Sequence, residues 1–208
     1  MPFKKDREYR LMTLPFSSVS EQKKFDTDYY VEGYATIFDK PYELWEEEGV
    51  KYMEVIDRHA LDNADMSDVI MQYDHRGKVF ARNKMGRGKP QTLLVQPDDV
   101  GFFIAADLQL TEDSRKMHED IDKGLIYEMS WAFIVSDDDY DRQTHTRTIK
   151  KVKKVFDVSA VSIPASPDTV ISARSWLDGV IEAEKQELLE QLELKKKKIK
   201  LKGLKTWN

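Results

Sequence analysis

Apolar and polar residues alternate along much of the chain with the two-residue period of half-buried strands. The alternation is clearest between residues 30 and 38, where the turn-forming run Asp39, Lys40 and Pro41 ends it. Short apolar segments separated by turn residues follow at residues 69–73, 92–95, 102–110, 125–135 and 155–163. The pattern predicts a series of short strands.

Helical spacing is rarer in this part of the chain. Residues 111–124 have a capping Thr111, a face shared by Met117 and Ile121, and Gly124 as a stop signal. A weaker helical pattern covers residues 58–65. Because strands outnumber helices, we expect a fold that is mainly β with α, in the form of a closed or nearly closed β-barrel ringed by a few helices.

The two ends of the chain differ from this body. Residues 1–28 are polar and mixed, and they predict an N-terminal arm or an edge strand ahead of a body over residues 29–174. In residues 175–208 apolar positions recur at helical spacing and lead into the basic block Lys195–Lys198. We therefore expect a C-terminal amphipathic helical tail. Its simplest role is a solvated helix packed on the body or on a partner subunit, and a specialised docking role is the alternative.

Composition excludes several functions. The 208 residues contain no cysteine, which rules out disulfides, thiolate zinc sites and a cysteine nucleophile. The net charge of -5 offers no general basic field to duplex nucleic acid. The charged N-terminus MPFKKDREYR is unlike a signal peptide, and no segment approaches the roughly 20 apolar residues of a membrane span. We expect a soluble cytosolic protein without a cofactor, which binds neither nucleic acid nor membrane.

The chain has only four histidines, so an imidazole base can be sought by elimination. His118 falls in a charged helical segment and His145 in a polar hairpin-like segment, so both are expected at the surface, whereas His59 is ambiguous. His75 stands at the end of the strand segment VIMQY, in the glycine-containing turn DHRGK, which places an imidazole at a strand rim, where catalytic groups are commonly held. This local pattern alone still favours a structural or turn role.

Ser130 lies in LIYEMSWAFIV, a segment with two different faces when it is extended. The face that includes Trp131 is large and apolar, whereas the face that includes Ser130 and Ala132 is small and partly polar. A hydroxyl in such a strand must be hydrogen-bonded or functional. The pattern alone favours the simpler alternative, a packed serine that bonds a neighbouring carbonyl.

Asp157 is a carboxylate in the middle of the apolar strand segment VFDVSAVSI. A carboxylate there must face solvent or have a cationic or donor partner, because an unpaired buried charge is costly. His75 could be that partner, and Ser130 would complete the hydroxyl, imidazole and carboxylate that acyl transfer requires. Should Ser130 not be the nucleophile, Ser159 and Ser162 on the Asp157 strand are the next candidates.

The acidic run DDDYD suggests a different kind of site. It contains Asp137, Asp138, Asp139 and Asp141, which are potential ligands for a hard metal ion. Consecutive carboxylates point in different directions and usually only solvate a turn. We therefore expect no metal site.

Five segments resemble, in order, the prohead protease family of tailed bacteriophages. They are VEGYATIFD, VIMQYDHRGKVFAR, DVGFFIAADL, IDKGLIYEMSWAF and FDVSAVSIPASPDT, and together they span roughly residues 30–172. The resemblance implies that His75 is the general base, Ser130 the nucleophile and Asp157 the third member. The chain departs from the family where Ala132 replaces a common glycine and where Asp157 replaces a frequent glutamate.

The same resemblance implies a fold like that of herpesvirus assemblin. Assemblins use a Ser-His-His triad in the chain order histidine, serine, third member, and the order here is the same. The loop over residues 163–168 would then form the oxyanion hole, with Pro164, Ala165 and Ser166 as its residues, and would supply backbone N–H groups to the oxyanion.

The implied function is that of a serine endopeptidase acting in prohead maturation. It would cut the scaffolding segment of the major capsid protein, and also itself, inside the immature capsid in the host cytoplasm. Its expected partners are the major capsid protein with that segment and a second copy of the chain, in a homo-oligomer (dimer). The alternative is a non-enzymatic scaffold or capsid-assembly protein with the same fold.

Overall fold

Strands dominate the computed structural model, which describes residues 7–12, 16–18, 20–162, 179, 182, 186–187 and 189–198. The strands are β1 (Glu8–Met12), β2 (Tyr30–Ile37), β3 (Tyr42–Glu47), β4 (Val50–Ile56), β5 (Ile70–Tyr73), β6 (Arg76–Arg82), β7 (Leu93–Pro97), β8 (Gly101–Asp107), β9 (Glu128–Asp141) and β10 (Thr146–Val161). The body also contains the helix α1 (Glu112–Asp122) and the short 3-10 helix η1 (Gly86–Gly88).

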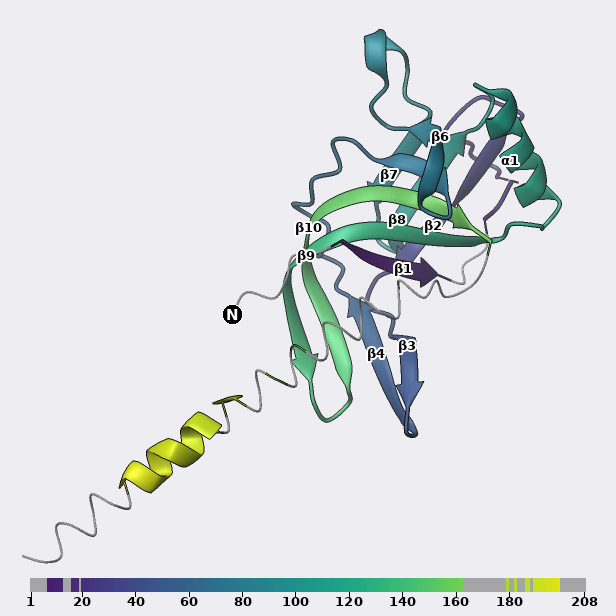
Figure 1. The fold of residues 1–208 in the computed structure, drawn as a ribbon. Helices are drawn as coiled ribbons and strands as arrows, with labels where there is room; N and C mark the ends of the chain where they lie inside the picture. Colours follow the sequence, from purple (N-terminus) through teal and green to yellow (C-terminus); the bar gives the residue numbers. More distant parts are fainter. Residues whose placement is uncertain are drawn as a thin grey trace, which may run out of the picture.

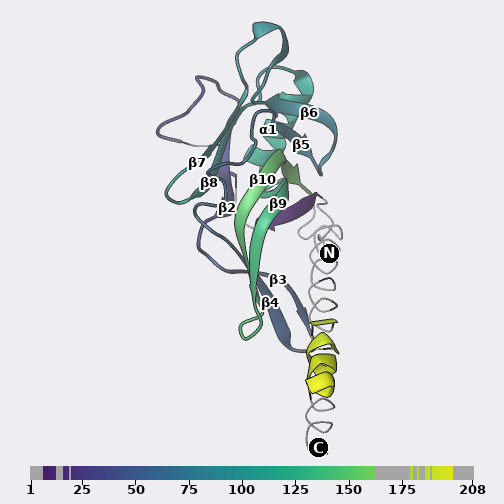
Figure 2. The ribbon, with the colours of Figure 1, turned by 90° about the vertical axis from the view of Figure 1, so that its left-hand side faces the viewer.

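A seven-stranded sheet is built around the long hairpin of β9 and β10. Its strand order is β1-β9-β10-β4-β3. In addition, β5 pairs with β10 along one edge and with β6 along the other. The outer edge of β10 is shared by two parallel strands, β4 along its first residues and β5 along its last. In Figures 1 and 2 this hairpin extends from the middle of the body to its lower end, where β3 and β4 lie beside it. The pairing with β5 brings the chain after Tyr73 next to the end of β10.

A second, three-stranded sheet has the order β2-β8-β7. Its register slips between Tyr34 and Ile37, where β2 passes very close to the start of β8. A Cβ atom built on Gly101 would lie 2.1 Å from the backbone oxygen of Thr36, so only glycine fits there.

The main core lies between the two sheets. Large apolar residues of β9 face it, and Trp131 stacks on Phe133 at 3.9 Å between ring centroids and meets Phe102 of β8 at 5.5 Å. All three side chains are fully buried. The alternation predicted for this strand is thus present, with Met129, Trp131 and Phe133 on the core side and Ser130 on the other.

The mainly β class is confirmed, but the expected barrel is not shown. Within the described residues the two sheets are not closed on themselves, because β1, β3, β6 and β7 each pair along one edge only, and β2 has only an isolated bridge from Glu32 to Ser17 on its second edge. The expected ring of helices is not present in the described part of the body, where α1, packed near β6, is the one α-helix.

The helix predicted over residues 111–124 is present as α1. Thr111 caps it by accepting a hydrogen bond from the Ser114 backbone at 3.1 Å. The helix predicted over residues 58–65 is wrong, because that segment is a series of turns closed by i to i+3 bonds, such as Ala60 N to Asp57 O at 2.9 Å.

The N-terminal segment contains a true edge strand, since β1 pairs antiparallel with β9. Near the C-terminus, residues 189–198 form a helix, as the spacing predicted, and its Leu189, Leu192 and Leu194 are exposed. None of the helices in the described residues is long and apolar enough to cross a membrane.

Candidate active site

The turn between β5 and β6 holds His75 in an unusual backbone conformation. Asp74 and His75 both have positive φ, at 47° and 56°, a left-handed pair that two-residue hairpins require and that glycine or asparagine usually supplies. The turn is fastened to the end of β10, because the Asp74 carboxylate accepts from the Ser162 backbone N–H at 2.9 Å and from its hydroxyl at 2.8 Å. The Asp74 N–H donates to the Ala160 carbonyl at 3.0 Å. The strained turn is thus held by three hydrogen bonds.

Ser130 and Asp157 are brought together by the pairing of β9 with β10. Ser130 lies opposite Ser159, and Ala132 lies opposite Asp157. Directly opposed residues share a face of the sheet, so the hydroxyl and the carboxylate project on the same side. Both side chains are buried, Ser130 with 3% and Asp157 with 1% of its surface exposed.

His75 bridges these two groups with its two ring nitrogens. Its Nε2 lies 2.7 Å from Ser130 Oγ, and its Nδ1 lies 2.5 Å from Asp157 Oδ1. An ionised carboxylate can only accept, so the proton of the neutral ring belongs on Nδ1. The lone pair of Nε2 then faces the serine hydroxyl. The structure thus brings together all three residues that the sequence singled out.

The Asp157 carboxylate has a second donor. Ser159 Oγ donates to Asp157 Oδ1 at 2.8 Å, and Ser159 is fully buried. Two hydrogen bonds therefore offset part of the cost of burying this charge. Ser159 was a reserve candidate for the nucleophile, but its hydroxyl is directed to the carboxylate. Ser162, the other reserve candidate, is bonded to Asp74.

Glu128 lies two residues before Ser130 on the same face of β9, and 6% of its surface is exposed. Burial raises the pKa of its carboxyl group above the ordinary value. The exposed fractions of Glu128 and Ser130 show that both side chains are shielded from solvent on this face, and shielding of this kind strengthens electrostatic interactions.

The other three histidines lie elsewhere in the structure. His59 is exposed and its Nδ1 lies 3.0 Å from Asp62 Oδ2. His118 is half-buried, contrary to the surface position expected for it, because it packs against the ring of Tyr29. His145 is half-buried, contrary to the surface position expected for it, and its Nδ1 lies 3.1 Å from the Tyr140 hydroxyl.

Two further predictions concerned the oxyanion hole and the acidic run of residues 137–141. Pro164, Ala165 and Ser166, expected to line the oxyanion hole, lie outside the described residues. In the acidic run, Asp137 pairs with Lys151 and Asp139 with Lys150, both at 2.9 Å. No group of three or more possible metal ligands occurs within the described residues.

Sequence reasoning missed Tyr9, which contacts His75, and gave Ser159 a different role from the one that its contact indicates. Tyr9 packs its ring against the imidazole, and Ser159 completes the hydrogen bonds of Asp157. A hydroxyl two positions after Asp157 was a usable signal for Ser159, since residues i and i+2 of a strand share a face. Nothing in the sequence near Tyr9 pointed to the site.

A hydroxyl, an imidazole and a buried carboxylate in this arrangement can carry out nucleophilic acyl transfer. A family model described as caudovirus prohead serine protease matches residues 17–180, a segment that contains all three groups. No curated protein and no solved structure matches the chain. Because the family model covers well over half of the sequence, the chain belongs to the caudovirus prohead serine proteases.

Proposed function

We propose that the chain is a serine endopeptidase in which Ser130 is the nucleophile and His75 the general base. Asp157 orients the imidazole and stabilises its protonated form. The observation that carries the proposal is the double contact of His75, 2.7 Å to Ser130 Oγ and 2.5 Å to Asp157 Oδ1. These distances already lie within the reach that proton transfer requires.

The chemistry follows from the geometry. Ser130 Oγ attacks the carbonyl carbon of the scissile bond while His75 Nε2 takes the hydroxyl proton. The imidazolium that forms is stabilised by Asp157, and it then returns the proton to the leaving amine as the C–N bond breaks. A water molecule, activated by the same Nε2, hydrolyses the acyl-enzyme and restores Ser130.

Family membership supports a proposal for the substrate. The enzyme cleaves the scaffolding segment of the major capsid protein, and also its own chain, inside the immature capsid in the host cytoplasm. In this proposal it acts as a homodimer on an assemblin-related scaffold, and backbone N–H groups of residues 163–168 stabilise the oxyanion. We propose no cofactor, because the relay needs none.

Cleavage of purified major capsid protein, with its scaffolding segment attached, tests this function directly. The wild-type chain is expected to release the segment, and Ser130→Ala is expected to leave it intact. Ser136→Ala is a matched control, since Ser136 lies on the same strand but its hydroxyl donates to the Lys151 carbonyl at 3.2 Å in an exposed position. This variant should cut at the wild-type rate.

The alternative of a non-enzymatic capsid-assembly protein predicts a different result. Such a protein would bind the capsid protein without cutting it, whatever residue stands at position 130. Stable binding without any cleavage by the folded wild-type chain would therefore contradict the proposed function.

A further inference from the structure

A tyrosine from the N-terminal strand packs against the imidazole of His75. The ring centroids of Tyr9 and His75 are 4.7 Å apart and the planes meet at 67°, an edge-to-face pair. Both nitrogens of His75 are engaged, by Ser130 and Asp157, so Tyr9 contacts the part of the ring that makes no hydrogen bond. It is an additional contact on a group that must keep one orientation.

The register of β1 places Tyr9 on the side of the sheet that carries the site. Leu11 lies opposite Ser130, and Tyr9 lies opposite Ala132, in an antiparallel pairing. Opposed residues share a face, and Ala132 in turn lies opposite Asp157. The strand thus forms one wall beside the nucleophile, and Tyr9 reaches from it to His75.

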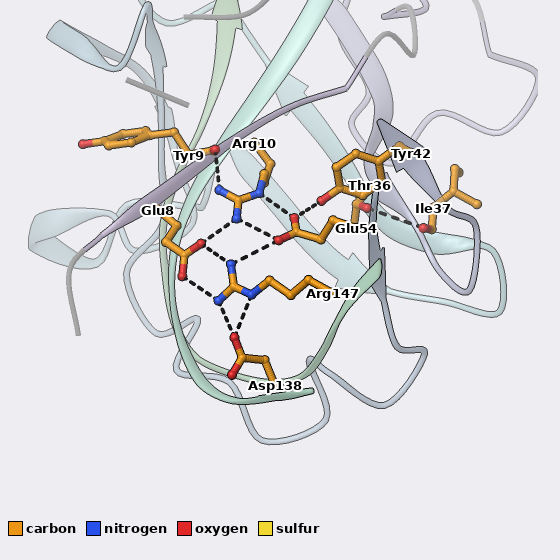
Figure 3. Close-up of polar contacts among 9 residues, drawn as sticks. All are labelled: Glu8, Tyr9, Arg10, Thr36, Ile37, Tyr42, Glu54, Asp138 and Arg147. Atoms are coloured by element: carbon orange, nitrogen blue, oxygen red, sulfur yellow. Dashed lines mark hydrogen bonds and ion pairs between the residues drawn. The ribbon is translucent and has the colours of Figure 1, made fainter. Parts of the chain in front are cut away.

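A buried ion network fixes this strand in place (Figure 3). Arg10 points to the other side of β1, where its Nε lies 2.5 Å and its Nη2 lies 2.8 Å from the carboxylate of Glu54 on β4. Arg147 of β10 joins the same carboxylate at 3.2 Å and reaches Glu8 at 2.7 Å. The side chains of Arg10 and Glu54 are fully buried.

The network also constrains the backbone at Tyr9 itself. Arg10 Nη1 donates to the Tyr9 carbonyl at 2.9 Å. In Figure 3 the Tyr9 ring points away from the network, while Arg10 extends into it. Ion pairs on one side of the strand therefore hold an aromatic ring on the other side, where the candidate triad lies.

His75 needs such a contact, because it stands at the tip of a turn. Its backbone has a positive φ of 56°, and 11% of its side chain is exposed. Two hydrogen bonds in the ring plane leave the imidazole free to tilt about the line that joins its nitrogens. A ring packed edge-to-face against it limits this tilt.

We propose that Tyr9 is a positioning residue, and that β1 is an integral part of the active site because it holds the Tyr9 ring against His75. This inference rests on the proposed function of His75. It adds a residue that lies before position 17, where the family match begins, so it does not come from the family resemblance.

The rate at which a small fluorophosphonate phosphonylates Ser130, with fluoride as the leaving group, tests the inference, since such a probe needs little of the peptide-binding surface. Tyr9→Leu should lower this rate per folded molecule by about 10-fold or more, because small misplacements of a catalytic group are costly. Tyr9→Phe keeps the ring and should retain the rate within about 2-fold. With a peptide substrate, the loss in Tyr9→Leu should appear in kcat, with KM nearly unchanged.

Tyr34→Leu is a matched control. Tyr34 makes an edge-to-face pair with Phe103 at the same 67°, but it lies in the three-stranded sheet. This variant should react at the wild-type rate. Should Tyr9→Leu fail to fold, Tyr9→Met provides an unbranched apolar replacement without a ring, and the same loss is expected.

Two results would overturn the positioning role. One is a folded Tyr9→Leu or Tyr9→Met that reacts as fast as the wild type. The other is a Tyr9→Phe that loses as much as Tyr9→Leu, since the hydroxyl and not the ring would then matter. A failure of the proposed function is distinguishable, because the wild-type chain would then not react with the probe, and the inference would fall with it.

Discussion

His75 shows how a single residue can be constrained from several directions. A turn with positive φ carries it, Asp157 and Ser130 bond its nitrogens, and Tyr9 covers its ring. The cost of the left-handed backbone is on the order of 1–3 kcal/mol for such a residue, and the hydrogen bonds of Asp74 to Ser162 help to offset it. Backbone strain of this kind is typical of functional sites.

The three proposed catalytic residues should differ in degree when they are changed. Ser130→Ala and His75→Ala each remove a group that takes part in bond formation, so each should slow cleavage by about 10⁴- to 10⁶-fold, and the double variant little more. Asp157→Asn acts through the imidazole and should cost about 10²- to 10⁴-fold. Initial rates on a scaffold-segment peptide would measure this, with circular dichroism and Tm as controls for folding. Equal losses for all three would contradict the assigned roles.

Ser159→Ala provides a finer test of the carboxylate. It removes one of two hydrogen bonds to Asp157 Oδ1 and leaves the bond to His75 in place. A neutral hydrogen bond contributes about 1 kcal/mol, so kcat should fall by about 5-fold, far less than in Asp157→Asn. If Ser159→Ala were inactive while folded, Ser159 would hold a more direct role than we assign to it.

Residues in the site differ in how far the sequence revealed them. His75, Ser130 and Asp157 were each unusual in their local sequence pattern. The resemblance of the surrounding segments to the prohead protease family then indicated that they act together. Tyr9 was invisible, because its contact depends on the pairing of β1 with β9, more than a hundred residues later in the chain. Long-range strand pairing leaves no local signal of that kind.

At the scale of elements, the strand β1 depends on charge as much as on backbone pairing. Arg10→Met would leave Glu54 and Glu8 without one of their cations inside the protein. Removing one partner from a buried pair typically costs about 3–5 kcal/mol, so chemical denaturation should show a loss of that order. Arg58→Ala is the matched control, since it breaks an exposed pair with Asp39 and should change the free energy of unfolding little. Equal effects of the two changes would contradict the structural importance of the network.

The network also predicts a dependence of stability on pH. Burial alone would raise the pKa of the Glu8 carboxyl, but Arg10 and Arg147 lower it from its ordinary value of 4.5 to about 2. A carboxyl whose pKa is lower in the folded state stabilises the fold above its unfolded pKa and loses that contribution as pH falls through its folded pKa. The free energy of unfolding should therefore decline between pH 4.5 and pH 2.

Glu8→Gln isolates this contribution. The variant should be less stable than the wild type at neutral pH, and the difference should shrink as the pH is lowered from 4.5 toward 2. Urea unfolding at several pH values measures both curves. A stability difference that stays constant over this range would show that the charge of Glu8 is not what matters.

The elements themselves were predicted unevenly. Alternation located β2, and short apolar segments bounded by turn residues located β5, β7 and β8. The outer halves of β9 and β10 were interpreted only as a polar hairpin-like segment and not as long strands, since their charged residues pair across the strands, as Asp137 does with Lys151. The helix expected over residues 58–65 failed because Ala60 and Leu61 are buried in a chain of turns instead.

At the scale of the whole molecule, topology decides the site. The parallel pairing of β5 with the end of β10 brings the turn of His75 to Asp157, and the hairpin brings Ser130 to both. Composition and periodicity gave the mainly β class, but they could not give strand order or closure. The expected barrel was inferred only from the number of short strands, and the sheets of the described residues are open.

The C-terminal tail should be separable from the chemistry. A chain truncated after Ala173 is expected to cut a short peptide at nearly the wild-type rate, since Ser130, His75 and Asp157 all precede that point. The exposed leucines of the helix over residues 189–198 suit a contact with another protein, so recruitment into assembling capsids or dimerisation should be lost. Peptide cleavage and co-assembly assays on the same truncated chain separate these effects. Loss of peptide cleavage with the body still folded would refute the division.

The central claim is that Ser130 is the nucleophile activated by His75. Mass-spectrometric mapping of a fluorophosphonate adduct on the full-length chain tests it most directly. The account predicts one adduct, on Ser130, that is absent from Ser130→Ala and nearly absent from a folded His75→Ala. An adduct on Ser159 or Ser162, or a folded wild-type chain that takes up no probe, would contradict it.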